Sequence, residues 1–462
     1  MMRRIELPWR SPLDAFRPLA RRDGSILLHG GALAADGDWS FVVTSPSAVV
    51  ERRRGETFID GRKTNASPFA ALSGLHSERR LASSGEIAAP LLSGLVGFVG
   101  YECARLVEPA ASHLESPYRA PDFWFGAYDA VAAFNRREKR AHLYGRTQAA
   151  MAHLQETLGE ERASGIAAAG ALSFLGAELS RDDYCRAVAE IVERIRAGEL
   201  FQANISQRLF FRAEEPFDPY ALFCSESLAS SASFGAYLRL ADAAILSLSP
   251  ERFFAATSGP DGRRRIIAEP IKGTRRRGAT PEEDAHLRAA LAADPKDRAE
   301  NIMIADLTRN DLSRICEDGS IREEAICELV SHANIHHLVS RISGVLRPDV
   351  TLADALASMF PCGSITGAPK IQAMKAIADI EGKGRGPYCG AIGYIDDRGG
   401  ADFAVAIRIA VVEGRAVAVP VGGGVTLRSD PQAEYDETLA KAAHWLRRGA
   451  GERAFKRDSD HR

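Results

Sequence analysis

The chain has 462 residues, of which 45% are hydrophobic and 26% are charged, and its formal net charge is −2 at pH 7. A chain of this length can bury a substantial core and is long enough for two or three domains, or for one large one. Its near balance of charge argues against a nucleic-acid partner, which would favour a basic face, and against electrostatic attachment to a membrane.

The cysteines and the N-terminus indicate the compartment. Seven cysteines are scattered along the chain and no two are spaced as C-x-x-C, so we expect neither a disulfide framework nor a zinc site. The first residues lack the apolar run of a signal peptide, and no stretch reaches the roughly 18 apolar residues of a membrane span. The sequence therefore predicts a cytoplasmic protein without a membrane partner.

The first third of the chain predicts short strands separated by turns, followed by a boundary. The clearest predicted strands cover 25–29, 40–50 and 94–101. Residues 146–172 are rich in alanine, glutamate and glycine, with a helical pattern over 151–161 and a linker over 163–171. We therefore divide the chain into an N-terminal region (1–172), a second region (173–448) and a polar C-terminal tail (449–462).

The second region opens with a helix and a strand. Ser180, with Asp183 three residues later, predicts a helix start, and apolar residues at helical spacing continue until Gly198. The strand that follows, 201–211, places four polar side chains on one face: Gln202, Asn204, Ser206 and Arg208. This row either lines a cleft or faces solvent, and the pattern does not decide between them.

Lys272 is the most distinctive candidate for chemistry. The short β-branched run 265–268 predicts a strand that delivers Lys272 to its C-terminal end. Ile271 can desolvate the amine and Gly273 lets a ligand approach the backbone, so Lys272 can serve as a nucleophile. The alternative is a solvated lysine in a turn. Upstream, Glu251 is the carboxylate of a predicted turn between two strands.

Two further segments have ambiguous patterns. In the helix predicted to begin at about residue 296, Asp297 and Glu300 lie near the apolar side, which indicates either a carboxylate site or an ordinary partner of the helix dipole. The glycine-containing segment 363–370 is superficially similar to a phosphate-binding loop. Proline replaces the glycine that such a loop requires before its lysine, so we do not expect a nucleotide site there.

Strands are predicted over 390–395 and 403–412, and the triple glycine at 422–424 that follows them precedes another predicted helix. Ser429 or Asp430 caps this helix and Pro431 occupies its first position, while the bare backbone beside the helix start suits the binding of a carboxylate. Three charged side chains share one face of this helix, either toward a site or as an exposed pair at i,i+4 spacing: Glu434, Glu437 and Lys441.

Taken together, these segments resemble the chorismate-utilising enzyme family over nearly all of residues 174–446. The motifs that carry the resemblance are SPERF (249–253), PIKGT (270–274), DRAENIMIADLTRND (297–311), HHLVSRISG (336–344), GSITGAPK (363–370), GPYCGAIGY (386–394), AIRIA (406–410) and EYDETLAK (434–441). Within the family, PIKGT and the N-terminal ELPW and LLHGG are similar to aminodeoxychorismate synthase component I. Anthranilate, isochorismate and salicylate synthases carry alanine in place of Lys272.

The resemblance implies a fold and a reaction. The fold is α+β, with two large antiparallel sheets packed as a sandwich, outer helices, and strands contributed by the N-terminal region. The reaction replaces the C4 hydroxyl of chorismate with an amino group from ammonia and gives 4-amino-4-deoxychorismate, the precursor of p-aminobenzoate and folate. Two alternatives stay open: an anthranilate synthase large subunit, and a non-catalytic scaffold that binds chorismate or tryptophan and regulates a partner.

The resemblance also implies roles for individual residues. Lys272 would attack C2 of chorismate, Glu251 would be the acid, and His337 matches the family's active-site histidine. The implied Mg²⁺ ligands are Glu300 and Glu437, with Asp297 and Glu434 as outer carboxylates. The implied substrate contacts are Thr366, Tyr394, Arg408, the backbone of Gly424, and Lys441.

The source of ammonia and two departures from the family pattern complete the expectations. No G-x-C-x-G motif surrounds any cysteine, so we expect a separate glutamine amidotransferase subunit to supply ammonia. Ile409 stands where family members usually have threonine, and Arg428 stands where many have aspartate. Both lie near the expected carboxylate-binding positions, where they can alter substrate affinity.

Overall fold

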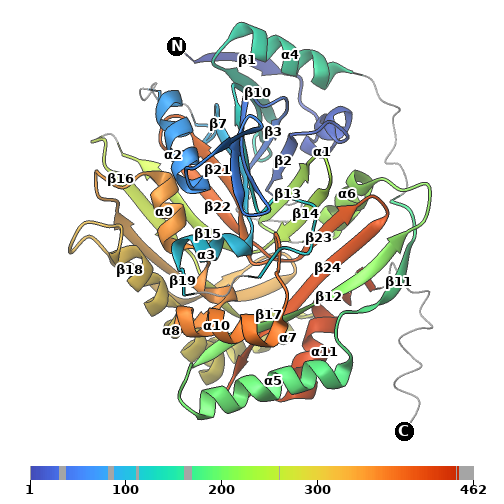
Figure 1. The fold of residues 1–462 in the computed structure, drawn as a ribbon, viewed down its shortest axis with the longest axis vertical. Coiled ribbons are helices and arrows are strands. Elements are labelled where there is room, and N and C mark those ends of the chain that lie inside the picture. Colours follow the sequence, from blue (N-terminus) through green and yellow to red (C-terminus); the bar gives the residue numbers. More distant parts are fainter. Residues whose placement is uncertain are drawn as a thin grey trace.

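The computed structural model describes residues 2–30, 38–81, 88–110, 114–160, 169–230, 232–259, 261–443 and 445–446. In these ranges the strands form two twelve-stranded sheets in which neighbouring strands pair antiparallel, and helices cover them from outside (Figure 1). The predicted fold class, an α+β sandwich of two large antiparallel sheets with outer helices, is confirmed. None of the described helices is both long and apolar enough to cross a membrane.

Sheet 1 has the strand order β1-β10-β9-β3-β2-β13-β14-β23-β24-β12-β11, and β20 pairs with β12. Its strands are β1 (Arg3–Leu7), β2 (Ser25–His29), β3 (Trp39–Val43), β9 (Ala130–Asn135), β10 (Arg140–Gly145), β11 (Leu172–Ala177), β12 (Gln202–Ala213), β13 (Phe234–Arg239), β14 (Ala244–Ser249), β20 (Gly367–Ala368), β23 (Ile409–Glu413) and β24 (Ala416–Thr426).

Sheet 2 has the order β17-β19-β16-β15-β22-β21-β7-β8-β4-β5-β6, and β18 pairs with β19. Its strands are β4 (Ala48–Arg53), β5 (Glu56–Ile59), β6 (Arg62–Thr64), β7 (Gly94–Val99), β8 (Phe123–Tyr128), β15 (Arg252–Ser258), β16 (Arg264–Ala268), β17 (Ile271–Arg276), β18 (Arg322–Ser331), β19 (Ile335–Val345), β21 (Gly390–Asp396) and β22 (Ala401–Ala406).

Strands from the first 145 residues lie in both sheets, so the N-terminal region is interleaved with the rest of the chain. In sheet 1, β2 pairs with β13, and in sheet 2, β7 pairs with β21. The division of the chain at residue 172 stays a prediction. Most of the predicted linker 163–171 and the whole tail 449–462 lie outside the described residues.

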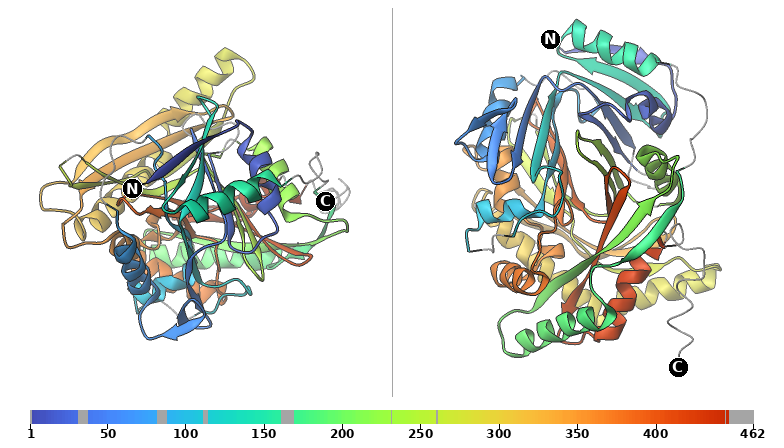
Figure 2. Two further views of the ribbon diagram at one scale, coloured as in Figure 1. Left: turned by 90° about the horizontal axis from the view of Figure 1, so that it is seen from above. Right: turned by 45° about the vertical axis from the view of Figure 1, so that its right-hand side comes forward.

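The helices gather at the two ends and on the outer faces. Their bounds are α1 (Pro12–Phe16), α2 (Pro68–Arg79), α3 (Ala104–Val107), α4 (Gln148–Gly159), α5 (Arg181–Arg196), α6 (Pro219–Ala229), α7 (Pro281–Ala293), α8 (Pro295–Ser313), α9 (Leu352–Met359), α10 (Lys370–Glu381) and α11 (Pro431–Lys441), with short 3₁₀ turns η1 (Arg17–Leu19), η2 (Tyr101–Cys103) and η3 (Gly363–Ile365). Helix α4 lies with β1 at one end, and α5 and α11 lie at the other (Figures 1 and 2).

Two predicted strands each prove to be two strands in different sheets. The predicted strand 40–50 contains β3 of sheet 1 and the start of β4 of sheet 2, and the predicted strand 403–412 contains parts of β22 and β23. Ser45 and Arg408, which lie between the members of each pair, both have φ of +53°. Such a residue ends the extended conformation, so the chain can turn from one sheet to the other.

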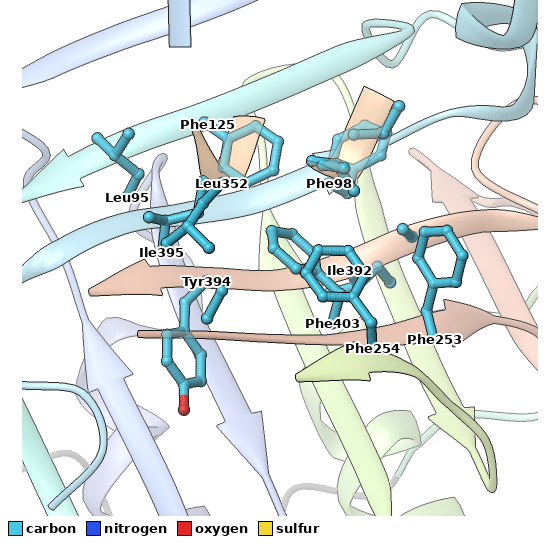
Figure 3. Packing of buried hydrophobic residues seen from close by; sticks show 14 of the residues in the cluster. Leu95, Phe98, Phe125, Phe253, Phe254, Leu352, Ile392, Tyr394, Ile395 and Phe403 are labelled. Atoms are coloured by element: carbon cyan, nitrogen blue, oxygen red, sulfur yellow. The ribbon is translucent and has the colours of Figure 1, made fainter. Parts of the chain in front are cut away.

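Three buried clusters hold the layers together. The largest lies between the sheets and contains Phe125, Phe254 and Phe403, whose rings are 5.2 to 6.1 Å apart (Figure 3). The second joins the other face of sheet 1 to α1, α4 and α6, and the third packs α5 and α10 against β12. Burial of apolar surface on both faces of sheet 1 explains why its central strands are almost continuously apolar.

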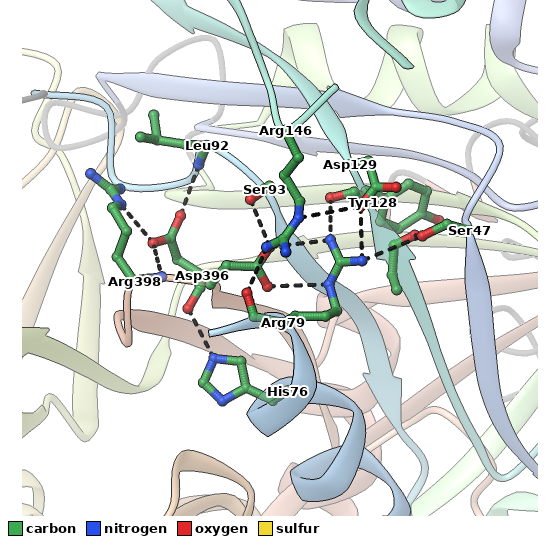
Figure 4. Close-up of polar contacts among 12 residues, drawn as sticks. Ser47, His76, Arg79, Leu92, Ser93, Tyr128, Asp129, Arg146, Asp396 and Arg398 are labelled. Carbon is green, nitrogen blue, oxygen red and sulfur yellow. Dashed lines mark hydrogen bonds and ion pairs between the residues drawn. The ribbon is translucent and has the colours of Figure 1, made fainter. Parts of the chain in front are cut away.

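A buried network of charges ties α2 to the turn between β21 and β22 (Figure 4). Asp397 is fully buried, and it pairs with Arg79 at 3.1 Å and with Arg146 at 2.8 Å. Ser93 also donates a hydrogen bond to Asp397 at 2.6 Å, and Arg79 pairs with Asp129 at 2.8 Å. The network joins residues from both sheets, because Arg146 follows β10 of sheet 1 and Asp397 follows β21 of sheet 2.

Candidate active site

Two of the places where the chain crosses from one sheet to the other lie next to each other. Glu251 lies between β14 of sheet 1 and β15 of sheet 2, and Arg408 lies between β22 of sheet 2 and β23 of sheet 1. Val405 N donates to Glu251 O at 3.0 Å, and Leu248 N donates to Arg408 O at 3.2 Å. The positive φ of Arg408 costs about 1–3 kcal/mol in a non-glycine residue, and such strain concentrates at functional sites.

Lys272 lies on a β-bulge, not at the end of the strand that was predicted to deliver it. Strand β16 ends at Ala268, and Lys272 is the second residue of β17, at the end of sheet 2. The register with β19 shifts so that Lys272 and Gly273 together oppose Leu338 alone. Gly273 has φ +85°, and a Cβ there would be 2.9 Å from Cβ of Asp297, so this bulge requires glycine.

The amine of Lys272 is surrounded by protein groups of both signs. Burial lowers its pKa, Lys441 lowers it further, and the nearby carboxylates of Glu300 and Glu251 act in the opposite direction. Desolvation dominates, so more of the amine is unprotonated and nucleophilic near neutral pH than for a lysine in water. The sequence-based alternative of a fully solvated lysine in a turn does not describe this environment.

Strand β24 approaches Lys272 through Gly424. A Cβ on Gly424 would be 3.3 Å from Nζ of Lys272 and 2.5 Å from Nε2 of Gln202, so a side chain at this position would displace the Gln202 amide and crowd the lysine. Gln202 is fully buried, and neither polar atom of its amide has a hydrogen-bond partner among the described residues. The predicted polar row therefore does not face solvent: Ser206 is also buried, and only 12% of the Arg208 side chain is exposed.

Glu251 is held in a form that can carry a proton. It is 4% exposed, and burial raises its pKa to about 7, against hydrogen bonds from Ser364 and from Ile271 N. Ser364 precedes the predicted substrate contact Thr366, which is fully buried and whose hydroxyl donates to the carbonyl of Cys362. Apart from the place of Ser364 within the glycine-containing segment and of Cys362 next to it, no sequence pattern indicated either residue.

Helix α8 directs two carboxylates toward the same region. Burial raises the pKa of both Asp297 and Glu300, and Glu434 on α11 raises that of Glu300 further. Oδ2 of Asp297 pairs with Arg275 at 3.1 Å. Oε1 of Glu300 is buried and accepts no hydrogen bond within the described part of the chain, and Lys296 approaches it only to 3.9 Å. This oxygen of Glu300 is therefore available to an additional positively charged group.

Helix α11 contributes two further carboxylates and a lysine to this region. A Cβ on Gly423 would be 3.0 Å from Oε2 of Glu434 and 4.0 Å from Oε1 of Glu437, so both carboxylates lie over the same glycine. Nζ of Lys441 lies 2.8 Å from Oε1 of Glu437 and donates to the carbonyl of Gly422 at 2.8 Å. Burial raises the pKa of Glu437, but Lys441, Lys296 and Lys272 together outweigh burial and leave the pKa below its ordinary value.

The donor set fits a hard cation such as Mg²⁺. Among the described residues, no three His, Cys, Asp or Glu side chains converge closely enough to form a complete protein cage. Mg²⁺ usually keeps several waters and takes only one or two carboxylates, so Glu300 and Glu437 suffice in number. The unpaired oxygen of Glu300 and the repulsion that raises its pKa both favour a cation at this place.

His337 and Arg408 lie near each other beside the bulge. His337 is buried, and burial, with the neighbouring His332 and Arg408, lowers its pKa to about 3, so its ring is neutral at physiological pH. Its Nδ1 is 2.9 Å from the hydroxyl of Thr274. Arg408 is exposed to water, yet surrounding protein lowers its pKa.

Tyr394, an expected substrate contact, is not brought to the Lys272 site. It lies on β21 and lines a separate cavity of about 690 Å³, where its ring is 5.6 Å from that of Phe41. Figure 3 shows Tyr394 directed away from Ile395 on the same strand. The charged groups that affect its pKa include Arg252 and Asp402, not Lys272. The alternation of side chains along β21, relative to its neighbours, decides this direction.

The structure also shows where three other residues singled out in the sequence lie. Lys370, the lysine of the segment similar to a phosphate loop, is bound by Asp311 at 2.6 Å and by the carbonyl of Met359 at 3.0 Å, so it is not free for a phosphate. Ile409 is fully buried in β23, and Arg428 is exposed in the loop before α11.

Comparison with known proteins gives a consistent result. The pattern of the chorismate binding enzyme family matches residues 29–447. The chain is 35% identical to aminodeoxychorismate synthase component 1 of Klebsiella aerogenes over 95% of this chain and 96% of that protein. It is 32% identical to anthranilate synthase component 1 of Mycolicibacterium smegmatis (strain ATCC 700084 / mc(2)155), over 96% of this chain and 89% of that protein.

A solved structure has the same architecture. The crystal structure of anthranilate synthase component I from Streptococcus pneumoniae TIGR4 superposes with a TM-score of 0.78 at 27% identity, over 88% of this chain and 92% of that one. The family match extends over both sheets and over α8, α10 and α11, which surround Lys272. The chain belongs to the chorismate binding enzyme family.

Proposed function

We propose that this chain aminates chorismate at C4, forming 4-amino-4-deoxychorismate, as the relative from Klebsiella aerogenes is named to do. One observation carries the proposal: the amine of Lys272, with its pKa lowered by burial, shares a site with Glu251, whose pKa is raised to about 7. A nucleophile and an acid with opposite shifts are the two groups that this substitution requires.

The proposed chemistry uses these two groups in sequence. The unprotonated amine of Lys272 attacks C2 while the C4–O bond breaks, and the carboxyl of Glu251 gives its proton to the departing oxygen, which leaves as water. Ammonia then attacks C4, the bond between C2 and the Lys272 nitrogen breaks, and that nitrogen takes up a proton from Glu251 while the new ammonium group on C4 gives one back, which restores the lysine amine and releases the product. The proton that the lysine amine loses after its attack returns Glu251 to its acid form.

The substrate is a dicarboxylate, and the site offers groups for both charges. Arg408 and Lys441 supply cations, and the bare backbone of Gly424 lets the ligand approach β24. We propose that Glu300 and Glu437 hold Mg²⁺, with Asp297 and Glu434 around it. When bound, the ion would neutralise the C1 carboxylate of chorismate.

Anthranilate formation is the second candidate, because relatives named anthranilate synthase component 1 match at 32% identity over nearly the full chain. In that reaction ammonia attacks C2, the position that Lys272 would occupy in the first candidate. A lysine bordering Glu251 in the site therefore favours C4 amination. The position of the new amino group distinguishes the two candidates.

The test is direct. The purified protein is incubated with chorismate, ammonium and Mg²⁺ at alkaline pH, and the products are separated and identified by mass and by fluorescence. We expect 4-amino-4-deoxychorismate, and we expect turnover to stop when a chelator removes Mg²⁺. Accumulation of anthranilate, or no turnover with a folded protein, would overturn the proposal.

A further inference from the structure

The β-bulge that carries Lys272 is closed by a side chain from another element. A bulge interrupts the hydrogen-bond ladder and leaves backbone groups without strand partners. Here Nδ2 of Asn301 donates to the carbonyl of Leu338 at 3.0 Å and approaches the carbonyl of Lys272 at 3.5 Å. These are the carbonyls of the two residues that face each other across the bulge. Asn301 therefore bridges β17 and β19 where the ladder is interrupted.

Asn301 is itself held firmly. It is fully buried, and its Oδ1 accepts a hydrogen bond from the hydroxyl of Ser340, so both ends of its amide are engaged. The backbone N–H of Ser340 donates to the carbonyl of Pro270 at 3.1 Å, two residues before Lys272. The bulge is thus fixed on one side by the Asn301 amide and on the other by the Ser340 backbone.

Asn301 also links the bulge to the acidic side of the site. It follows Glu300 directly on α8, so one helix turn presents a carboxylate toward Lys272 and inserts an amide beneath the backbone of the same lysine. We propose that Asn301 is a positioning residue that sets the direction of the Lys272 amine relative to α8. This inference rests on the proposed function, in which Lys272 is the nucleophile.

Nucleophilic attack tolerates only a small displacement of the reacting atoms. The reacting atoms must be about 3–3.5 Å apart and aligned, and a displacement of 1 Å can lower the rate about 10²-fold. A bulge without its bridging amide can slide in register or rotate, and either motion moves a side chain that begins at the bulge. A purely structural asparagine would instead change only the fraction of folded protein.

The experiment compares Asn301→Ala with Asn310→Ala, a change of the same residue type at an exposed position of the same helix. For Asn301→Ala we expect kcat for C4 amination to fall about 10²-fold, with little change in KM for chorismate. Asn310→Ala should match the unmodified protein. Adding Asn301→Ala to Lys272→Ala should cause no further loss, because the residue acts through the lysine.

A second readout does not depend on the reaction. Reductive methylation of Lys272 with formaldehyde and borohydride, followed by peptide mass, measures its reactivity as a function of pH. In Asn301→Ala we expect the midpoint of this profile to rise toward that of an ordinary lysine, because the amine leaves its buried position. An unchanged midpoint together with unchanged kcat per folded molecule would overturn the inference. So would a loss of kcat in the Lys272→Ala, Asn301→Ala double variant that equals the product of the losses in the two single variants.

Ser340→Ala provides the test if Asn301→Ala does not fold. It removes the hydroxyl that holds Oδ1 of Asn301 but keeps the asparagine in place. We expect a smaller rise in the same pH midpoint, and no rise would overturn the inference. Failure of the proposed function would show separately, as the absence of C4-aminated product from the unmodified protein, while the methylation profile would still report on the position of Lys272.

Discussion

Opposite pKa shifts at two neighbouring residues are the chemical signature of this site. Burial lowers the pKa of the Lys272 amine and raises that of the Glu251 carboxyl to about 7, so the two pKa values lie closer together than those of a free lysine and a free glutamate. Each shift disfavours the charged form, and the mutual attraction of the charged forms only partly opposes it. Burial by itself therefore favours an unprotonated amine at Lys272 and a protonated carboxyl at Glu251.

Lys272→Ala should change the product more than the stability. The side chain lies on a bulge at the end of sheet 2 and contributes no large apolar group to the core, so the cost to stability should be about 1 kcal/mol or less. C4 amination should collapse, and residual turnover should shift to C2-substituted products. Chromatography of the products and intact mass with chorismate check this. Wild-type rates of C4 amination would contradict it.

Glu251→Gln should stabilise the protein at pH 8 while abolishing C4 amination. The folded pKa is raised from 4.5 to about 7, so the stabilising contribution of this carboxyl is complete below pH 4.5 and is lost as the pH rises to about 7. A glutamine has no such loss, and the difference reaches about 3 kcal/mol above pH 7. Urea unfolding at pH 5 and pH 8 measures it. Equal differences at both values would show that Glu251 ionises normally.

At the scale of elements, the site depends on two helices and on breaks in strands. Helices α8 and α11 bring Glu300 and Glu437 to the same lysine, although the chain between the two helices passes through strands of both sheets. The strand breaks at Lys272 and Arg408 aim side chains that a regular ladder would place elsewhere. Regular elements form the frame, and irregular positions carry the chemistry.

The network at Asp397 makes a testable contribution to the frame. Asp397→Ala should lower the free energy of unfolding by about 3–5 kcal/mol, because it leaves Arg79 and Arg146 partly buried without their shared carboxylate. The control is Asp349→Ala, whose side chain is 78% exposed and should stay within about 0.5 kcal/mol. Urea unfolding at pH 7 compares them, and similar midpoints for both variants would contradict a stabilising network.

At the scale of the whole molecule, the two sheets share one chain in an interleaved order. Strands from the first 145 residues lie in both sheets, and the site forms where later segments cross from one sheet to the other. The site residues named above all follow residue 172, yet the sheets that carry them include strands from before it, so a cut at residue 172 would separate the site from part of its frame.

The amino donor is also a property of the whole molecule. We predict that glutamine alone supports no C4 amination by the isolated chain, whereas ammonium does, and that a separate glutamine amidotransferase subunit restores the use of glutamine. Activity with each donor, measured with and without that subunit, checks this. Glutamine-dependent turnover by the isolated chain would contradict it, after removal of contaminating ammonium by dialysis.

Local patterns predicted what short-range physics controls. Helix α11 begins where the capping residues indicated, with Asp430 accepting from Ala433 N and Pro431 at the first position, because a cap needs only residues a few positions apart. The helix at Ser180 follows the same rule. The motif resemblance also selected Lys272, Glu251, Glu300 and Glu437, and the structure places all four within one electrostatic neighbourhood.

Only the tertiary structure decided the arrangements that depend on strand pairing. The run 403–412 is apolar on both sides of Arg408, so its pattern reads as one strand, although its halves pair in different sheets. Tyr394 lies away from Lys272 because the register of β21 against β7 and β22 sets its direction. The bulge at Lys272 arises from the pairing of β17 with β19, and its closure by Asn301 arises from contacts between residues 29 and 37 positions apart. No periodic pattern of residues along the sequence indicates such contacts, because they form only when separate strands meet.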